Sequence, residues 1–362
     1  MIDRRMFLAG TGAVLLATPL AAEPFGTEPC SLGSSGRRRG RDMKISQMFL
    51  AAKVVICWLL AAISPATAAT YHFTTLDVPG AGPTGTEAFG INDQGQATGF
   101  FFDPFGSNLA ESGLLYSKGT FASIDVPGAF VTNAAGINDA GQIVGDYIVA
   151  GQRSLGFLKT GNTFTTVDMA GQTEVHLRGI NNAGQVVGWY GFPFTNGLVY
   201  DVKTGGIVTL SVPLTVETIL FGINDTAQIV GAYAGPRDQG SHGFLFSGGS
   251  FTTIDVPGAF TTTASGINNE GQIVGSYAKP GDFGGHGFLY SDGSFTTIDL
   301  PGAAYTSVSG INDAGQLVGV FASDRSGALH GFLATPVPGP ASLAFLSAGL
   351  VALGTMSRRK RP

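Results

Sequence analysis

Short apolar, β-branched and aromatic runs alternate with clusters of glycine, asparagine, aspartate and proline through residues 69–335. Runs this short, each ended by turn-forming residues, are typical of antiparallel β-strands and not of helices. In ASGIN-NEG-QIVGSY, around Asn268, two apolar stretches flank a polar turn. Asparagine or aspartate followed two residues later by glycine predicts a type I turn with that glycine in the left-handed conformation, closing a β-hairpin.

One phrase, Gly-Ile-Asn-(Asp/Asn)-x-Gly-Gln and three further residues, occurs six times with small variations. Its copies are 43 to 46 residues apart and start at Gly90, Gly136, Gly179, Gly222, Gly266 and Gly310. A Phe-Thr-Thr-Ile-Asp-Val-Pro-Gly-Ala type of phrase and a Gly-Phe-Leu-Tyr type keep the same period. Each unit therefore supplies two hairpins, and six such units predict an all-β, six-bladed β-propeller-like ring of four-stranded repeats.

The ends of this repeat region predict how the ring closes. A lone Phe-Thr-Thr strand (73–77) opens it and a lone Gly-Phe-Leu strand (331–334) ends it, although the two are hairpin partners in every internal unit. We expect them to pair and remove the exposed sheet edge. The Asp-Val-Pro-Gly-Ala segment is nearly constant in length, so we expect it to join the blades and to place the Gly-Ile-Asn strand innermost. If the variable loop after Val-Gly joins them instead, the Gly-Phe-Leu strand is innermost.

Charge separates this body from the ends of the chain. Residues 69–335 contain 8 basic and 21 acidic residues, a formal net charge of −13, whereas the flanks hold 12 of the 20 Lys and Arg residues. An acidic body repels phosphate backbones, which excludes nucleic acid as an expected partner. Both cysteines, Cys30 and Cys57, precede the body, so disulfides, thiolate catalysis and cysteine-ligated zinc are not expected in it. No motif indicates a cofactor.

The N-terminal region has the layout of export signals. Residues 43–68 have a basic start, an apolar segment and the small-residue cleavage site Ala66-Thr67-Ala68, which predicts a secretory signal peptide and a mature chain from about Ala69. Residues 1–42 carry Arg4-Arg5 before an apolar run and resemble a twin-arginine leader. Since two export signals in tandem are redundant, we expect translation to start at Met43, with residues 1–42 as an upstream, non-native segment.

The last segment, residues 336–362, has three parts in a fixed order. Val337-Pro338-Gly339-Pro340 is followed by an apolar run (341–356) and a basic tail that includes Arg358 and Arg359. This order resembles the PEP-CTERM sorting signal of exopolysaccharide-producing Gram-negative bacteria, with Pro-Gly-Pro in place of Pro-Glu-Pro. The resemblance implies an exosortase-type partner, transient membrane anchoring, and a final place at the envelope, outer surface or extracellular matrix. The alternative is a plain membrane anchor, although 16 apolar residues are fewer than the roughly 20 needed to span a bilayer.

The repeat phrases resemble a second family. In the HAF extracellular repeat, a Gly-Ile-Asn-x-x-Gly-Gln-x-x-Gly hairpin is paired with a His-Ala-Phe-Leu strand. Here that strand begins with His242, His286 and His330 in the last three units, with Gly for Ala. The resemblance spans the body of the chain and implies an extracellular location and a shape more than a chemistry.

Residues that recur in every unit are interpreted as scaffold. Three histidines suggest a metal site, but they fall in separate units, so we expect them to begin strands and bond a neighbouring loop. The recurring aspartates have similar environments, unlike the two differently tuned carboxyls of a glycosidase, so we expect them to bond turns. An aromatic residue shared by all units is also assigned to the scaffold, at Phe101, Tyr147, Tyr190, Tyr233, Tyr277 and Phe321.

The variable loops after each Val-Gly break the repeat and are expected to share one face. Aromatic residues peculiar to single units occur there, and exposed aromatics beside Asp and Asn suit stacking and hydrogen bonding to sugars. In the alternative, the same residues plug the ring face or pack on neighbouring blades. The candidate binding residues are Phe105, Trp189, Phe192, Phe194 and Phe283.

These patterns predict an exported, non-enzymatic propeller that binds or organises exopolysaccharide or protein partners through its loops. A polysaccharide hydrolase or lyase is the first alternative and a passive surface scaffold is the second. An enzyme needs an acid/base pair among residues that break the repeat. The candidates for that pair are Glu174, His176, Arg178, Arg237 and Asp238.

Overall fold

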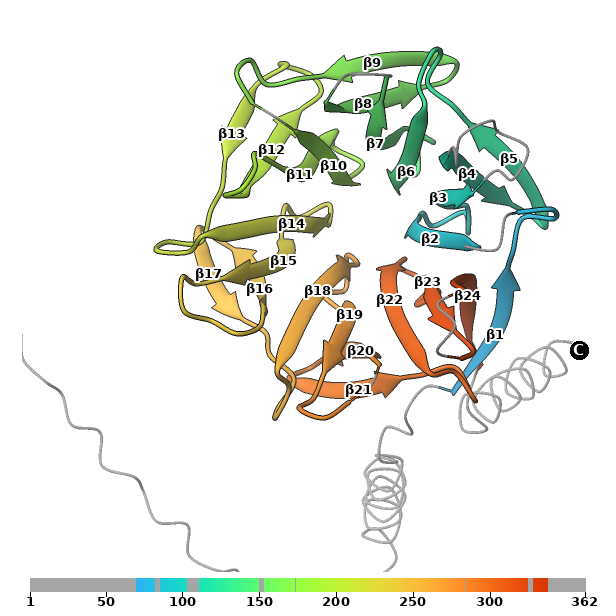
Figure 1. Ribbon diagram of the computed structural model, residues 1–362, viewed down its shortest axis with the longest axis vertical. Helices are drawn as coiled ribbons and strands as arrows, with labels where there is room; N and C mark the ends of the chain where they lie inside the picture. Colours follow the sequence, from blue (N-terminus) through green and yellow to red (C-terminus); the bar gives the residue numbers. More distant parts are fainter. Residues whose placement is uncertain are drawn as a thin grey trace, which may run out of the picture. The chain divides into compact units, whose positions relative to one another are not determined.

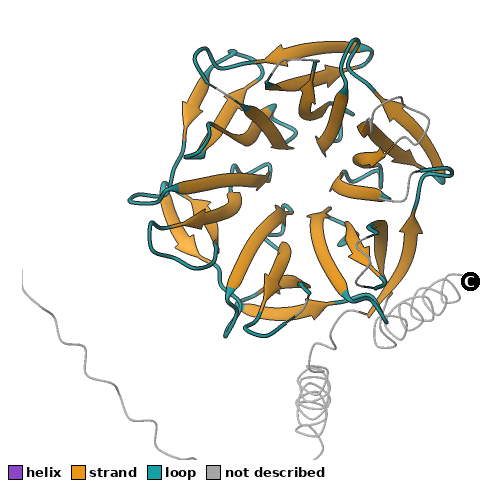
Figure 2. Ribbon diagram, in the orientation of Figure 1, coloured by secondary structure: helices purple, strands orange, loops and turns teal. Residues whose placement is uncertain are grey.

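Six four-stranded antiparallel sheets surround a central axis in the computed structural model, which describes residues 70–81, 85–102, 111–149, 153–172, 174–282, 284–324 and 328–337. The sheets are the blades of a β-propeller (Figure 1), as the repeat period predicted. All regular elements of these residues are strands (Figure 2). In this part of the chain no helix is long and apolar enough to cross a membrane.

Each blade is a meander whose strands follow one another from the axis outwards. The innermost strands are β2 (Thr86–Ile91), β6 (Val131–Ile137), β10 (Val175–Ile180), β14 (Glu217–Ile223), β18 (Thr261–Ile267) and β22 (Tyr305–Ile311). The second strands are β3 (Ala97–Phe102), β7 (Ile143–Ile148), β11 (Gln185–Tyr190), β15 (Ile229–Ala234), β19 (Ile273–Ala278) and β23 (Leu317–Ala322). The third strands are β4 (Glu111–Ser117), β8 (Ser154–Thr160), β12 (Asn196–Asp201), β16 (His242–Ser247), β20 (His286–Ser291) and β24 (His330–Val337). The outer strands are β5 (Thr120–Ile124), β9 (Thr163–Val167), β13 (Ile207–Thr209), β17 (Ser250–Thr253), β21 (Ser294–Ile298) and β1 (Thr70–Leu76).

We number the blades 1 to 6 by their innermost strands, from β2 to β22. The Gly-Ile-Asn strand is innermost in all six, which confirms the preferred prediction and excludes the Gly-Phe-Leu strand. The Asp-Val-Pro-Gly-Ala segment makes the connection between blades. In blade 2, the Val126 amide at this connection donates to the hydroxyl of the buried Thr132, which opens the next innermost strand.

Blade 6 is completed by the first strand of the repeat region. β1 pairs with β24 in antiparallel register from Thr70↔Val337 to Leu76↔Gly331, which confirms the predicted closure (Figure 1). The last strand continues to Val337, two residues past the predicted boundary at residue 335, because Pro336 and Val337 still face partners on β1. Val337, the first residue of the predicted sorting motif, is therefore part of the propeller.

Two glycines of the repeat phrase are explained by the backbone. A side chain at Gly145 would meet the carbonyl oxygen of Asn133 at 1.8 Å, because the innermost strand bulges against its neighbour there. Gly141 ends the hairpin turn in the left-handed region, with φ of 72°. In blade 4 this turn residue is Ala227, which keeps φ of 59° and the same amide hydrogen bond to the asparagine that opens the turn.

The core of each blade is centred on the third strand. The phenylalanine of the Gly-Phe-Leu phrase has no exposed surface at Phe157, Phe244, Phe288 and Phe332. Phe244 contacts Phe251 of the outer strand edge to face, with ring centroids 5.3 Å apart. Burying such a ring stabilises the fold by about 1.5 to 3 kcal/mol, which explains why the phrase recurs.

Two closed rings of hydrogen bonds join the six blades at the end of the innermost strands. In the inner ring, the buried asparagine of each Gly-Ile-Asn phrase donates from Nδ2 to the carbonyl oxygen of its counterpart in the next blade. The donors are Asn92, Asn138, Asn181, Asn224, Asn268 and Asn312, and the last bond returns to Asn92 across 220 residues of sequence. The asparagines therefore fix the position of each blade. From the sequence they were predicted only to form the hairpin turn.

The following residue forms the outer ring, in which each backbone amide donates to the side chain of the next blade. Asn182 and Asn269 each place their side-chain amide between two carboxylates, and Asp225 accepts from both. Asp93 instead stands between the carboxylates of Asp139 and Asp313, where an alternating ring would have a third asparagine. Burial, together with these neighbouring charges, raises the pKa of Asp93.

We expect the substitution Asp93→Asn to stabilise the protein. An amide at this position can donate to both flanking carboxylates and completes the alternation, for a gain of about 0.5 to 1 kcal/mol in the free energy of unfolding near neutral pH. Because the pKa of Asp93 is raised in the folded state, the ionised Asp93 side chain destabilises the fold at higher pH. The stability gained from the asparagine should therefore shrink as the pH falls towards the ordinary aspartate pKa of about 3.9. Thermal denaturation from pH 4 to 8 measures it.

The matched control is Asp225→Asn, the same chemical change at the position that accepts from two amides. It should lower the melting temperature, because amide then faces amide on both sides. Equal shifts in the two variants would contradict the alternation.

Candidate functional site

A tunnel runs along the propeller axis in three consecutive sections. The narrow end, about 70 Å³, is lined by the Ile-Asn-Asp/Asn residues of all six turns, and a middle section of about 80 Å³ by the Gly-Ile residues before them. The third section is a cavity of about 300 Å³ around the first halves of the innermost strands. These strands begin at the blade connections, on the face that also holds the variable loops, so the cavity lies on the side of that face.

The residues that line this cavity come from only three positions of the repeat, which we call the three axial positions. The first position lies on the innermost strand, three residues before the glycine of Gly-Ile-Asn, and the second lies one residue before that glycine. The third position lies on the second strand, directly after the glycine of Val-Gly. The first and third positions face each other across the strand pair, as in Glu87↔Phe100 and Asn133↔Asp146. The lining residues are Phe89, Phe100, Asn133, Ala135, Arg178, Phe221, Thr263, Ser265, Ser276, Ser307 and Ser309.

The axial positions differ from blade to blade although the residues around them are nearly constant. Blades 1 to 3 carry Glu87, Phe89, Phe100, Asn133, Ala135, Asp146, His176, Arg178 and Trp189. Blades 4 to 6 carry Ile219, Phe221, Ala232, Thr263, Ser265, Ser276, Ser307, Ser309 and Val320. One side of the axis is therefore ionisable and aromatic, and the other is dominated by small hydroxyl residues.

Asp146 is the centre of the ionisable side and is 2% exposed. Its Oδ1 accepts a hydrogen bond from Arg178 Nη1 of the next blade at 3.0 Å, and its Oδ2 accepts from Asn133 Nδ2 at 3.2 Å. Burial alone would raise the pKa of Asp146, but Arg178, His176 and Asn133 outweigh it and lower that pKa. Asp146 is thus held as a carboxylate that fixes its neighbours from two blades.

His176 lies between two carboxyls and against Trp189. Its Nδ1 is 3.2 Å from Asp146 Oδ1 and its Nε2 is 3.5 Å from Glu174 Oε2, without well-aligned hydrogen bonds from either buried nitrogen. The ring stacks on the Trp189 indole, with centroids 3.9 Å apart and planes 21° apart. The indole therefore uses one face within the protein.

Glu87 and Glu111 form a carboxyl pair in blade 1. Burial, and secondarily the charge of Glu111, raise the pKa of Glu87 to about 7. Burial, and secondarily the charge of Asp146, also raise the pKa of Glu111. Near neutral pH the Glu87 carboxyl is consequently protonated in part of the molecules and ionised in the rest. It can therefore donate a proton to a ligand or accept one.

The sequence-predicted binding residues are placed differently from one another. Phe192 and Phe194 lie in the loop between β11 and β12 and are 73% and 64% exposed. Trp189 was expected in this loop but belongs to β11, where the strand pairing continues through Trp189↔His176 and Trp189↔Gly197, so its side chain lies beside the axis. Phe105 and Phe283 lie outside the described residues, as do Ala66, Ala68, Pro338, Gly339, Pro340, Arg358 and Arg359.

Exposed apolar side chains also occur on the chain segment beside Phe194. Thr195 forms a β-bridge to Glu217, and its carbonyl oxygen accepts from the Thr218 amide, which joins the blade 3 loop to the start of blade 4. Leu214 and Val216, just before this junction, are 95% and 36% exposed. The variable-loop face therefore has an apolar region at blades 3 and 4.

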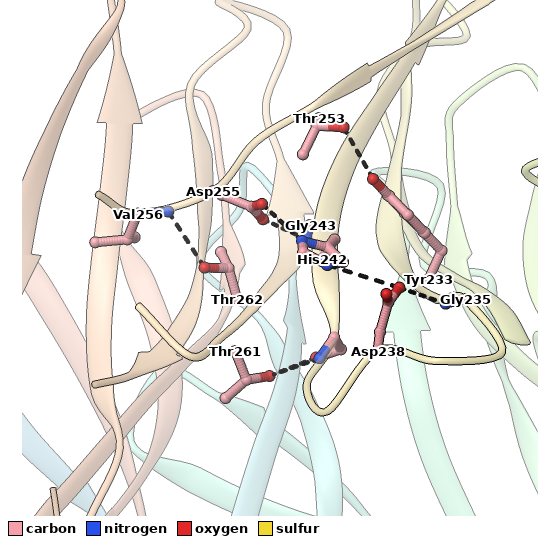
Figure 3. Close-up of polar contacts among 11 residues, drawn as sticks. Tyr233, Gly235, Asp238, His242, Gly243, Thr253, Asp255, Val256, Thr261 and Thr262 are labelled. Carbon is pink, nitrogen blue, oxygen red and sulfur yellow. Dashed lines mark hydrogen bonds and ion pairs between the residues drawn. The ribbon is translucent and has the colours of Figure 1, made fainter. Parts of the chain in front are cut away.

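The three histidines are explained without a ligand. In blade 4, His242 Nδ1 lies 2.7 Å from Asp255 Oδ2, and the ring stacks on Tyr233 (Figure 3). The recurring aspartate thus bonds the start of the third strand, through this histidine and the Gly243 amide. His286 and His330 repeat the pairing with Asp299 and Asp77 at 2.8 and 2.9 Å, which confirms that they begin strands and bond a loop.

The tyrosines at the shared aromatic position are also scaffold, as predicted. The Tyr233 hydroxyl is 3.0 Å from Thr253 Oγ1 on the outer strand of its own blade (Figure 3). Tyr147, Tyr190 and Tyr277 make the same contact with threonines of their own blades.

The proposed catalytic residues separate into two groups. Glu174, His176 and Arg178 converge near Asp146. Asp238 is instead bound within its own loop, accepting from the Gly235 amide at 2.6 Å, 3.7 Å from His242 (Figure 3).

The sequence analysis missed Glu87, Glu111, Asn133 and Asp146. A comparison of the six repeats position by position could have found three of them, because Glu87, Asn133 and Asp146 stand at axial positions where other blades have uncharged residues. Glu111 begins β4, away from the axial positions, and has no such signal. Within the described ranges, no group of three His, Cys, Asp or Glu residues is arranged to hold a metal ion.

No family model matches the chain, and no curated protein matches it. Among solved structures, TolB from Acinetobacter baumannii is 10% identical over 66% of this chain and 63% of its own, with a TM-score of 0.44. A Pyrococcus horikoshii acylaminoacyl peptidase is 9% identical over 75% of this chain and 46% of its own, with a TM-score of 0.44. The SapL1 lectin is 12% identical over 72% and 98%, with a TM-score of 0.48. The chain spans less than two thirds of the first two, and likeness at this level carries no argument about function.

The raised pKa of Glu87 predicts a pH-dependent stability. Between the ordinary glutamate pKa of about 4.3 and the folded value of about 7, the folded protein holds a proton that the unfolded chain releases. Stability should therefore fall by up to about 3 to 4 kcal/mol as the pH rises through this window and then level off. In the Glu87→Gln variant the fall should be largely absent in denaturant titrations at pH 4.5, 6 and 7.5. An unchanged slope in this variant would assign the proton to another group.

Proposed function

We propose that this protein is an exported, non-enzymatic propeller that binds polysaccharide through its variable-loop face. One observation carries the proposal. The repeat is nearly constant where it builds strands, turns and blade contacts, and it varies where residues line the axial cavity or stand on the neighbouring loops. Side chains that vary while their scaffold is repeated are the pattern expected of a ligand surface.

The chemistry of this face suits sugars. Phe192 and Phe194 present exposed rings for stacking, and amide and hydroxyl groups line the axial cavity on the side of the same face. The formal charge of −13 over residues 69–335 disfavours nucleic acids and other polyanions. This negative charge does not repel an uncharged polysaccharide. A protein partner is the second kind of ligand that this face suits.

The location is part of the same proposal. The signal-like residues 43–68 would direct export, and the PEP-CTERM-like residues 336–362 would be recognised by an exosortase-type enzyme after transient membrane anchoring. With its resemblance to HAF repeats, the protein is then placed at the envelope, outer surface or extracellular matrix of a Gram-negative bacterium. Its task there is adhesion or matrix organisation.

We expect Phe192→Ala combined with Phe194→Ser to weaken binding to the exopolysaccharide of the producing cell by about 10- to 100-fold, since stacking of an aromatic ring contributes about 1 to 1.5 kcal/mol per contact. Val208→Ala is the control, because Val208 is also 65% exposed but lies on an outer strand. Sedimentation of the purified protein with the polymer measures the affinity. Equal binding by all three proteins, or none by the wild type, would reject the proposal and leave a passive scaffold.

A second function is favoured by the carboxyls of blade 1. Glu87 has a pKa of about 7 and interacts electrostatically with a second half-buried carboxyl, Glu111, and pairs of carboxyls with different pKa values act as acid and base in hydrolases and lyases that cleave polysaccharides. If the protein is an enzyme, the polymer should shorten with time, and Glu87→Gln should abolish shortening while binding remains. Glu174→Gln and His176→Ala test the pair expected from the sequence. A constant polymer length with the wild type excludes this function for that polymer.

A further inference from the structure

We propose that the axial cavity is a subsite for the terminal residue of a neutral saccharide chain, which enters end-on from the variable-loop face. This inference rests on the proposed function and adds the ligand class and the orientation. Its basis is the composition of the cavity wall, its hydrogen-bonding groups and the narrowing of the tunnel.

The shape favours a chain end. The cavity of about 300 Å³ is at the lower limit of ligand pockets, which range from about 300 to 1,000 Å³. Beyond it, the tunnel narrows to sections of about 80 and 70 Å³ inside the two hydrogen-bonded rings. The cavity is therefore the one of the three sections with room for a sugar ring, and in our proposal the chain end lies there with the rest of the polymer on the variable-loop face.

The charges favour a neutral ligand. Arg178 is the only cationic side chain among the described residues of the cavity wall, and it is already paired with Asp146 at 3.0 Å. An anionic sugar would find this cation neutralised. A cationic sugar would make no direct ion pair, because the described lining residues include no carboxylate and the buried Asp146 is already paired.

Hydrogen-bonding groups without partners lie between blades 2 and 3. Asn133 donates to Asp146, but its buried Oδ1 accepts from no described residue. Arg178 has five N–H groups, and among the described residues it donates only to Asp146. Because Asp146 holds both side chains, one on each oxygen, an acceptor and several donors are fixed close together. Two neighbouring hydroxyls of a sugar satisfy both, one donating to Asn133 and the other accepting from Arg178.

The remaining wall complements the rest of a sugar ring. Hydroxyls of blades 5 and 6 can exchange hydrogen bonds with further sugar hydroxyls, and phenyl rings offer surfaces for the C–H face. These residues are Thr263, Ser265, Ser276, Ser307, Ser309, Phe89, Phe100 and Phe221. The wall therefore combines many polar groups with apolar surface and lacks a strong net charge, which is the composition that a neutral sugar requires.

The repeat itself supplies substitutions that the fold accepts. Ser276 occupies the axial position where blade 1 has Phe100, so Ser276→Phe fills the cavity with a residue that the same backbone already carries. Asn133→Thr introduces the residue that blade 5 has there, Thr263, and removes the amide. Ser276→Phe should fold with little change in melting temperature, so its loss of binding can be assigned to the cavity. Asn133→Thr also removes the hydrogen bond to the buried Asp146 and should lower the melting temperature, so its binding is measured well below that temperature.

Trp189 reports on the site, since its indole stacks on His176 beside the cavity and the chain has only one other tryptophan, Trp58. We would titrate the protein with D-glucose, D-galactose, D-mannose and L-fucose, with D-glucuronate and D-glucosamine as charged comparators, and follow the fluorescence. Trp189→Phe, which introduces the residue of blade 1, should remove the signal.

The expected result is saturable binding of at least one neutral sugar, weakened at least tenfold by Ser276→Phe and about tenfold by Asn133→Thr, and changed less than twofold by Phe192→Ala. Each tenfold loss corresponds to about 1.4 kcal/mol. The inference is overturned if no neutral sugar binds, if only a charged comparator binds, or if Ser276→Phe binds as the wild type does.

Polymer binding separates this inference from the proposed function. If the wild type and Ser276→Phe bind the polysaccharide equally well, the loop face binds and the cavity has no part in it. If the wild type binds neither polymer nor free sugar, both proposals fail.

Discussion

The ring of asparagine hydrogen bonds around the axis is the contact on which the arrangement of the blades depends. Each asparagine is 3–4% exposed, and its amide is shared between the glutamine of its own turn and the next blade's backbone. A buried amide left without partners costs about 1 to 3 kcal/mol, so a blade that is displaced or missing would leave two such groups unsatisfied. The hydrogen bond from Asn312 to Asn92 and the pairing of β1 with β24 close the ring, so every blade has a neighbour on both sides.

Because repeated residues fix the blades, the side chains at the axial positions are not needed to hold the fold together. The glycine that admits the bulge and the asparagine of the ring are present in every unit, and the phenylalanine of the blade core is replaced only by leucine, at Leu114 and Leu198. The side chains between them can then be charged in blades 1 to 3 and small in blades 4 to 6 without disturbing the backbone. A symmetrical scaffold thus carries an asymmetrical site.

The asymmetry also has an electrostatic consequence. Asp146 is buried but has Arg178 and Asn133 on its two oxygens, so its pKa is lowered, whereas Glu87 is buried beside another carboxyl and its pKa is raised. Two acidic groups in adjacent blades therefore have opposite protonation tendencies around one axis. The difference comes from their partners, since both are withdrawn from solvent.

The sequence alone determined the number of blades and the closure of the ring, and it favoured the strand order that the structure has, because these follow from local periodicity and from turn residues that act within a few positions. It also determined that His242 and its counterparts belong to the scaffold. Only the tertiary structure decided that Asn133 and Arg178 line one cavity with Asp146 bound to both, and that Trp189 lies beside the axis and not in a loop. These contacts join blades about 40 residues apart and depend on side-chain direction and strand register, neither of which a repeat period specifies.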